Sequence, residues 1–132
     1  MGAMSNALEV ALLNATLRNI PYTSPSTVYL ALYTNDPTDA DLGTEVSGGG
    51  YVRQVVTFGV PVQVDGNGTS TNTIVVTFPI ATANWGTITH FGIRSAATGG
   101  TLLFHGPINS PRSILSDDQL RFSIGDIEVD MG

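Results

Sequence analysis

The first twenty residues repeat apolar side chains with the period of an α-helix. These side chains recur at i, i+3, i+4 and i+7 spacing and would form one face: Leu8, Ala11, Leu12 and Ala15, with Leu13 beside them. Ser5 or Asn6 can cap the free N–H groups at the start, and Asn19 followed by Pro21 ends the pattern. We therefore predict one N-terminal amphipathic helix over residues 5–19.

After Pro25 the hydrophobic period changes from 3.6 residues to 2. In Thr27–Thr34 both faces carry apolar residues, which favours a covered strand. Similar β-branched or aromatic stretches recur at short spacing, separated by turns rich in Gly and Asn: Tyr51–Phe58, Val60–Val64, Thr73–Phe78, Thr87–Arg94, Thr101–Phe104 and Leu120–Val129. The last stretch contains Gly125, so a bulge or a split into two strands is expected there.

Short strands with no helices between them are typical of antiparallel β proteins. Thr87–Arg94 and Thr101–Phe104, joined through Gly99 and Gly100, form the clearest hairpin. We predict a mainly β fold, an antiparallel and jelly-roll-like β-sandwich over residues 27–130 with the helix at one end. At this length the chain fits a single domain, residues 1–132.

The segment Asn35–Gly50 is long for a connection inside a compact domain, and such loops are usually functional or packed against something. The helix and this loop are the elements that a sandwich needs least, so we expect docking there. The candidate interface residues are Leu8, Leu12, Asp36, Asp39, Asp41 and Trp85. Two alternatives stay open: the helix can close its own sandwich, and Trp85 can anchor a loop rather than bind a ligand.

The same loop holds the densest group of carboxylates in the chain. Oxygen atoms of Asp36, Asp39, Asp41 and Glu45 could bind calcium, and Gly43 would permit a turn. The order of the acidic residues does not match an EF-hand, and Asp and Thr beside a proline also form turns. We predict no metal or other cofactor, with calcium as the alternative for this loop.

Composition narrows the range of partners. Of 132 residues only 12% are charged, the formal net charge is −6, all five basic residues are arginine, and cysteine is absent. The negative charge argues against nucleic acid and anionic membranes, and the lack of cysteine excludes disulfides and thiolate sites. No apolar run approaches the roughly 20 residues of a membrane span. We therefore expect protein partners, with no nucleic acid and no membrane.

No catalytic motif stands out in the sequence. His90 and His105 lie on the two strands of the predicted hairpin and could share a metal, although two ligands do not complete a site. Asp117-Asp118 could be an acid pair of the glycosidase kind, but adjacent residues of a strand point to opposite faces. We predict that the chain is not an enzyme.

Two blocks of sequence resemble a family of small phage proteins. One block joins Thr27–Thr34, Asp36-Pro37-Thr38 and Thr44–Gln54, and the other is Ala83–Ile93 followed by Gly99–Gly106. With the N-terminal helix, they make the chain similar to small virion structural proteins labelled as phage tail-fibre-like adaptors. The resemblance implies a β-sandwich that joins or decorates other phage proteins, and it carries no catalytic residue.

This resemblance implies a virion structural protein on the tail or the outer capsid surface, assembled in the host cytoplasm. We expect it to dock onto other phage structural proteins and to form a homo-oligomer, with a trimer as the first choice. A capsid decoration (cement) protein and a host-surface carbohydrate- or receptor-binding module stay open as alternatives. The missing catalytic constellations disfavour a third class, a small hydrolase.

Overall fold

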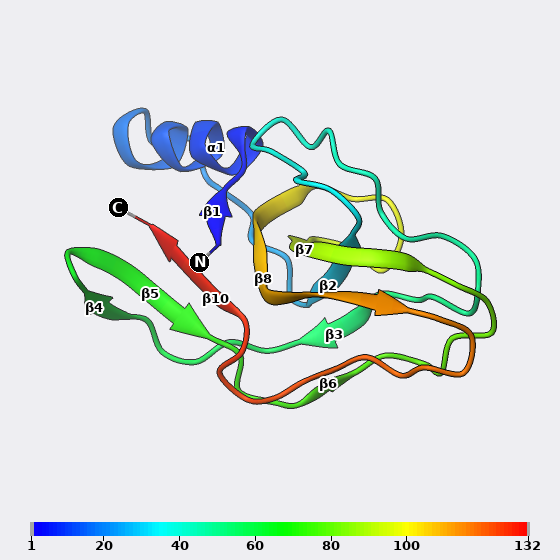
Figure 1. The fold of residues 1–132 in the computed structure, drawn as a ribbon. Coiled ribbons are helices and arrows are strands. Elements are labelled where there is room, and N and C mark those ends of the chain that lie inside the picture. Colours follow the sequence, from blue (N-terminus) through cyan, green and yellow to red (C-terminus); the bar gives the residue numbers. More distant parts are fainter. Residues whose placement is uncertain (1, 132) are drawn as a thin grey trace.

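The computed structural model describes residues 2–131, which form antiparallel β-sheets and one helix (Figure 1). The elements are β1 (Ala3–Met4), α1 (Asn6–Leu17), β2 (Val28–Tyr33), β3 (Gln54–Val56), β4 (Val62–Val64), β5 (Asn67–Thr71), β6 (Val76–Thr77), β7 (Gly86–Arg94), β8 (Leu102–Ile114), β9 (Arg121–Phe122) and β10 (Glu128–Met131). The largest sheet has the order β1-β8-β7-β2-β3, a second has the order β10-β5-β4, and β6 pairs with β9. The predicted mainly β, antiparallel fold with a helix near the N-terminus is confirmed.

The sheets enclose a shared cluster of buried apolar side chains in a sandwich-like arrangement. Aromatic rings from segments far apart in the sequence meet inside it. Tyr51 stacks on Phe78 with 6.0 Å between ring centroids, and Trp85 meets both rings edge-on. Phe122 approaches Phe78 from β9, also edge-on. Such pairs contribute about 0.5–1.5 kcal/mol each beyond area burial. The cluster therefore helps to hold together the segments from which these rings come.

The N-terminal residues join the two larger sheets. Ala3 and Met4 pair with β8, so β1 forms one edge of the five-stranded sheet. On its other side, Gly2 donates to the Glu128 carbonyl at 2.7 Å and accepts from the Asp130 N–H at 2.9 Å. Gly2 bridges β10 in parallel, which continues the hydrogen bonding from one sheet to the other. The pattern of hydrophobic residues did not predict this short strand.

Helix α1 begins and ends as the capping residues predict. Ser5 accepts from the Leu8 N–H through its hydroxyl oxygen at 3.2 Å. At the other end the Asn14 carbonyl accepts from the N–H groups of Arg18 and Ile20, and Asn19 between them has φ 54°. The helix therefore ends at a short left-handed cap, close to the predicted bounds of 5–19.

The amphipathic character of α1 is weaker than predicted. Leu8 is buried and Leu12 is half-buried, but Leu13, which was placed beside them, is exposed. Val10 and Leu17 are exposed as well, so the outward side of the helix is also apolar. The 3.6-residue spacing identified the inward face correctly, whereas the outer face lacks the charges that would make the helix amphipathic.

Strand β8 is much longer than the predicted Thr101–Phe104, although it contains Pro107 and Pro111. β1 covers β8 only at Phe104 and His105, so beyond these residues one side of β8 is free of a ladder partner. Pro111 lies where the β7–β8 register shifts, between the pair of Ile88 with Arg112 and that of His90 with Pro107. The hairpin of these two strands is confirmed, with Gly99 and Gly100 in its turn.

Strand β5 was not predicted from the sequence, because its residues are Asn, Gly, Ser and Thr. It is a strand because its backbone pairs with β10 on one side and β4 on the other, although its side chains do not favour a strand. Other strands are shorter than predicted: β3 within Tyr51–Phe58, β4 within Val60–Val64 and β6 within Thr73–Phe78. The C-terminal stretch is split into β9 and β10, with Gly125 at φ 86° between them.

Candidate interaction surfaces

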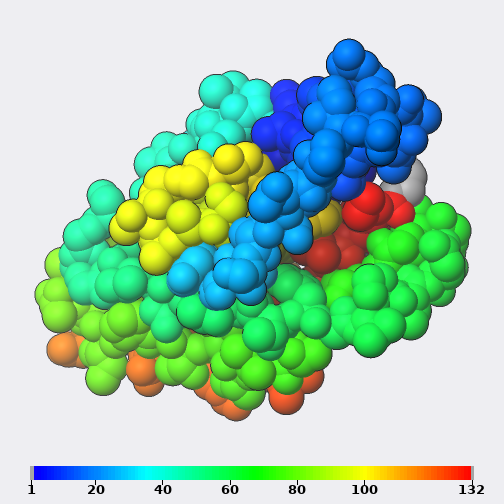
Figure 2. Space-filling view, turned by 180° about the vertical axis from the view of Figure 1, so that it is seen from behind, coloured from blue at the N-terminus to red at the C-terminus, as the bar shows by residue number. Residues whose placement is uncertain are grey.

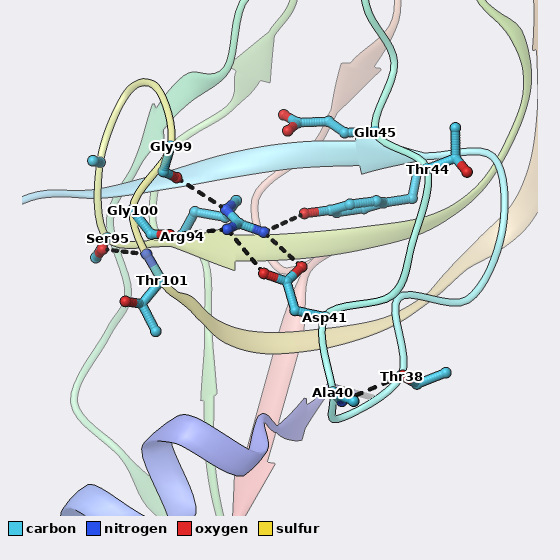
Figure 3. A network of polar contacts seen from close by, with 12 residues as sticks. Thr38, Ala40, Asp41, Thr44, Glu45, Arg94, Ser95, Gly99, Gly100 and Thr101 are labelled. Atoms are coloured by element: carbon cyan, nitrogen blue, oxygen red, sulfur yellow. Dashed lines mark hydrogen bonds and ion pairs between the residues drawn. The ribbon is translucent and has the colours of Figure 1, made fainter.

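The long loop after β2 is fixed to the sheet by an arginine at the end of β7 (Figure 3). Arg94 meets the two carboxylate oxygens of Asp41 at 2.8 and 3.0 Å. It also donates to the Tyr33 hydroxyl at 3.0 Å and to the carbonyl oxygens of Gly99 and Gly100. Every N–H of the guanidinium is thereby used, and its planar fork fits a two-pronged pair with a carboxylate.

Burial and ionic contacts act in opposite directions on Arg94. Burial alone would lower the pKa of its guanidinium, but the hydrogen bonds to Asp41 and Tyr33 outweigh it and raise that pKa. Burial also raises the pKa of the Tyr33 hydroxyl. Neither group changes its protonation near neutral pH, so the cluster is a structural anchor rather than an acid–base site.

Glu45 fixes the second half of the loop. Arg53 donates to both of its carboxylate oxygens at 2.8 Å, and the Tyr51 hydroxyl donates at 2.6 Å. Burial opposes the ionisation of Glu45, but these hydrogen bonds outweigh burial and hold its pKa below the ordinary 4.5. Arg53 also donates to the carbonyls of Ala96 and Gly99. Both arginines therefore clamp the loop to the turn between β7 and β8.

The tip of the loop meets both α1 and β8. Asp39 Oδ1 lies 2.7 Å from His105 Nε2, and Asp36 Oδ1 lies 3.7 Å from the other ring nitrogen. The Asn6 N–H at the start of the helix donates to the Asp39 carbonyl at 2.8 Å. Asp39 therefore connects loop, helix and sheet, and both its carbonyl oxygen and its Oδ1 already have partners inside the chain.

The candidate metal ligands do not converge on one point. Among residues 2–131, no three His, Cys, Asp or Glu side chains are arranged so that they could hold a metal ion. The carboxylates considered for calcium go to separate partners, Asp41 to Arg94 and Glu45 to Arg53. Two of the four carboxylates are thus engaged in ion pairs with arginine.

The residues considered for catalysis contact separate neighbours. His90 Nδ1 lies 2.8 Å from the Thr89 hydroxyl, whereas His105 faces the loop carboxylates. Asp118 accepts from the Leu115 N–H at 2.8 Å and closes a turn. These contacts define local structure and bring no nucleophile, base and acid together.

Three of the expected interface residues face inward. Trp85 is 6% exposed, its indole N–H donates to the Gly49 carbonyl at 2.8 Å, and it anchors the loop to the core. Leu8 is buried and Leu12 is half-buried against the body. The other three lie at the surface, as expected of a loop: Asp36, Asp39 and Asp41.

The exposed apolar residues form surfaces that were not expected from the sequence. Val10, Leu13 and Leu17 of α1 are 59%, 58% and 77% exposed. A second group lies on and beside β4 at the end of the β4–β5 hairpin, where the exposed residues are Val60, Val62 and Val64. Val10, Leu13 and Leu17 are three and four residues apart, so the sequence contained a pattern for the first group. The prediction used only the apolar face that includes Leu8.

Two hollows lie elsewhere on the molecule. A cavity of about 300 Å³ lies between the two larger sheets, and apolar residues such as Val28, Phe104 and Val129 line it. A groove of about 400 Å³ separates α1 from the chain at Tyr22–Pro25. Figure 2 shows this chain crossing the back of the molecule and α1 protruding at one end. The helix is therefore attached along one side, and its outer side faces away from the body.

Fold and surfaces together show a small β protein with an anchored loop and exposed apolar patches. No helix in the described part of the chain combines the length and hydrophobicity needed to cross a membrane.

Residues 3–130 match the family model described as podophage GP4 fiber I protein gp80. Because the match spans nearly the whole chain, the chain belongs to this family of phage fibre proteins. The resemblance to phage tail-fibre-like structural proteins is thereby confirmed. No curated protein matches the chain.

Proposed function

We propose that this phage fibre protein is an adaptor that docks onto other structural proteins of the virion, without enzymatic activity. The observation that carries the proposal is the anchored loop. Asp41 and Glu45 tie it to Arg94 and Arg53 at 2.8 Å, yet Leu42 between them is 73% exposed. An apolar side chain held out on a fixed loop can bind with little loss of conformational freedom.

The proposal includes a homo-oligomer, with a trimer as the first choice, located on the tail and assembled in the host cytoplasm. Membership in a fibre family supports association with other phage proteins. The net charge of −6 supports partners that are proteins rather than nucleic acid or anionic membrane.

The experiment that tests this function compares phage particles assembled with variant chains. Quantitative mass spectrometry of purified particles should find the wild-type chain in many copies. Leu42→Asp should fold normally but be depleted from the particles, because a charge would have to be buried at the docking contact. Ile124→Asp, at a comparably exposed turn, is the matched control and should be incorporated.

Two results would overturn the proposed function. One is absence of the wild-type chain from purified particles, and the other is equal incorporation of the Leu42 and Ile124 variants. Circular dichroism of both purified variants excludes unfolding as the cause of any depletion.

The carbohydrate-binding alternative receives no support from Trp85. Sugar-binding sites commonly use an exposed aromatic face, but this ring is packed edge-on against Tyr51 and Phe78 and its N–H donates to the Gly49 carbonyl. The observations therefore favour docking between proteins over recognition of host sugars.

A further inference from the structure

The cavity between the two larger sheets is bounded by side chains from both of them. Val28, Ile93 and Phe104 line it from the five-stranded sheet, where Ile93 and Phe104 are register partners. Ser70 of β5 and Val129 of β10 line it from the second sheet and are register partners as well. Because register partners point to the same face of a sheet, the two sets of side chains bound the cavity from opposite sides.

The small residues of β5 explain why this space stays open. Sheets packed face to face lie about 10 Å apart, and side chains of ordinary size fill the gap between them. On β5 the lining residues are Gly68, Thr69 and Ser70, and Thr69 alternates to the opposite face. Glycine and serine therefore oppose the apolar side chains of the other sheet, and about 300 Å³ is left between them. Native interiors rarely contain voids much larger than a water molecule, so a space of this size is suited to a ligand.

The walls of the cavity offer little to a polar ligand. The Ser70 hydroxyl donates to the Gly59 carbonyl at 2.7 Å, so its hydrogen is already used inside the chain. Asp130 is the one charged residue of the lining, but it follows Val129, and its side chain therefore alternates to the opposite face. There it accepts from the Asn67 amide at 3.4 Å. Water finds few partners in such a cavity, which therefore selects uncharged, apolar molecules.

Size and access narrow the class of ligand further. An apolar cavity of about 150 Å³ holds one benzene molecule, so twice that volume suits two fused rings. Pro61 and Met131 belong to the lining and are exposed, so the cavity reaches the surface and a ligand can enter. The rings of Phe58 and Phe104 are half-buried at the same cavity. We propose that this cavity is a binding site for an uncharged, apolar small molecule of about the size of naphthalene.

Naphthalene itself is the probe, and NMR of the full chain locates it. Titration should shift the amide signals of Ser70, Phe104 and Val129 through the ring current of the bound molecule, and the shifts should saturate at one molecule per chain. The compound 2-naphthoate has the same two rings with a carboxylate attached. It should bind at least about tenfold more weakly, because a charge without partners would have to be buried.

Two variants fill the cavity from opposite walls. Val28→Phe adds volume from β2, and Gly68→Val adds it from β5, where a Cβ would have ordinary contacts at 3.8 and 3.9 Å. Each should weaken naphthalene binding at least about tenfold, because the new side chain and the rings compete for one space. Val62→Phe, on the neighbouring β4 and 59% exposed, is the matched control and should bind like the wild type. Circular dichroism verifies that each variant folds, and either filling variant is sufficient for the test.

The proposal is overturned if naphthalene causes no saturable shifts, if the shifts lie away from the cavity, or if 2-naphthoate binds as tightly. Wild-type affinity in a folded Val28→Phe or Gly68→Val chain would also overturn it. Loss of naphthalene binding as the concentration of the chain is raised would mean that a second copy fills the cavity, which would assign it to a protein contact instead. These results are separable from the proposed function, since a chain that binds no naphthalene could still be found in many copies in purified particles.

Discussion

At the scale of single residues, the chain uses its few cations for fixed contacts. Two of its five arginines, Arg53 and Arg94, each hold a carboxylate through two nitrogens. Lysine could supply the charge but not the planar fork that fits both carboxylate oxygens. The absence of lysine noted in the sequence thus agrees with the geometry of the loop anchors, although the sequence could not tell which acidic residue each arginine would meet.

The acid sensitivity of the loop should depend on Glu45. Its pKa is held below the ordinary 4.5, so its stabilising contribution is complete above pH 4.5 and is lost as the pH falls through the lowered value. Glu45→Gln should therefore reduce the free energy of unfolding at pH 7 by about 1.5–3 kcal/mol, the usual contribution of charged hydrogen bonds. The difference from the wild type should be smaller at pH 3 than at pH 7, because pH 3 lies below the ordinary pKa of 4.5.

Urea denaturation at the two pH values measures this difference. Arg53→Gln is the companion variant, since it removes the other half of the ion pair. Its difference from the wild type should also shrink at low pH but not vanish, because Arg53 donates to the carbonyls of Ala96 and Gly99 at any pH. If Glu45→Gln lowers the free energy of unfolding by the same amount at pH 7 and at pH 3, the ion pair contributes no pH-dependent stability.

Among the helices and strands, the sequence predicted correctly those whose own side chains favour the observed backbone conformation. The helix was found from its spacing and caps, and β2, β7 and the start of β8 from their β-branched and aromatic residues. Prediction failed for β5 and for the long β8, whose strand form is imposed by neighbouring strands rather than by their own Gly, Ser and Pro residues. The sequence predicted that the long loop is functional or packed against something, but it did not show that Asp41 would be anchored to Arg94 at the end of β7.

Of the three glycines before Tyr51, Gly48 and Gly49 should differ sharply in their tolerance of a side chain. Gly48 and Gly49 have φ values of 74° and 60°, so alanine is conformationally unfavourable at both. A Cβ at Gly49 would lie 2.9 Å from the Trp85 ring, whereas a Cβ at Gly48 would meet open space. Gly49→Ala should thus cost about 1–3 kcal/mol more than Gly48→Ala, the usual penalty of overpacking.

Thermal unfolding followed by tryptophan fluorescence checks this prediction. Trp85 is the single tryptophan of the chain, so its emission also reports a displaced ring in the folded state. Equal melting temperatures for the two alanine variants would contradict the close packing of Gly49 against Trp85.

In the whole molecule, a few N-terminal residues connect the two larger sheets by backbone hydrogen bonds. Gly2 lies between them, bonded to β10, and the following residues pair with β8. Sequence patterns could not identify this link, because two residues are too few to show a period and glycine carries no side chain. Its importance follows from where the backbone lies, since the sheets are joined at this edge by hydrogen bonds of the N-terminal segment.

Substitutions at Gly2 and Ala3 should therefore have very different effects, although the residues are adjacent. A Cβ at Gly2 would approach the Glu128 carbonyl and a Val129 methyl group to 3.0 Å, and the carbonyl belongs to the backbone of β10. Ala3 is exposed. Gly2→Val should lower the free energy of unfolding by about 1–3 kcal/mol through overpacking, and Ala3→Val should leave it nearly unchanged.

Hydrogen exchange locates the effect within the molecule. In Gly2→Val the Asp130 amide, which donates to the Gly2 carbonyl, should lose protection, whereas amides of the β2–β7 pair should keep theirs. Uniform loss across both sheets would mean that the molecule opens only as a whole, and unchanged protection at Asp130 would mean that the link does not hold β10. Local loss is expected because β10 pairs with β5 on one side and is bonded to Gly2 on the other.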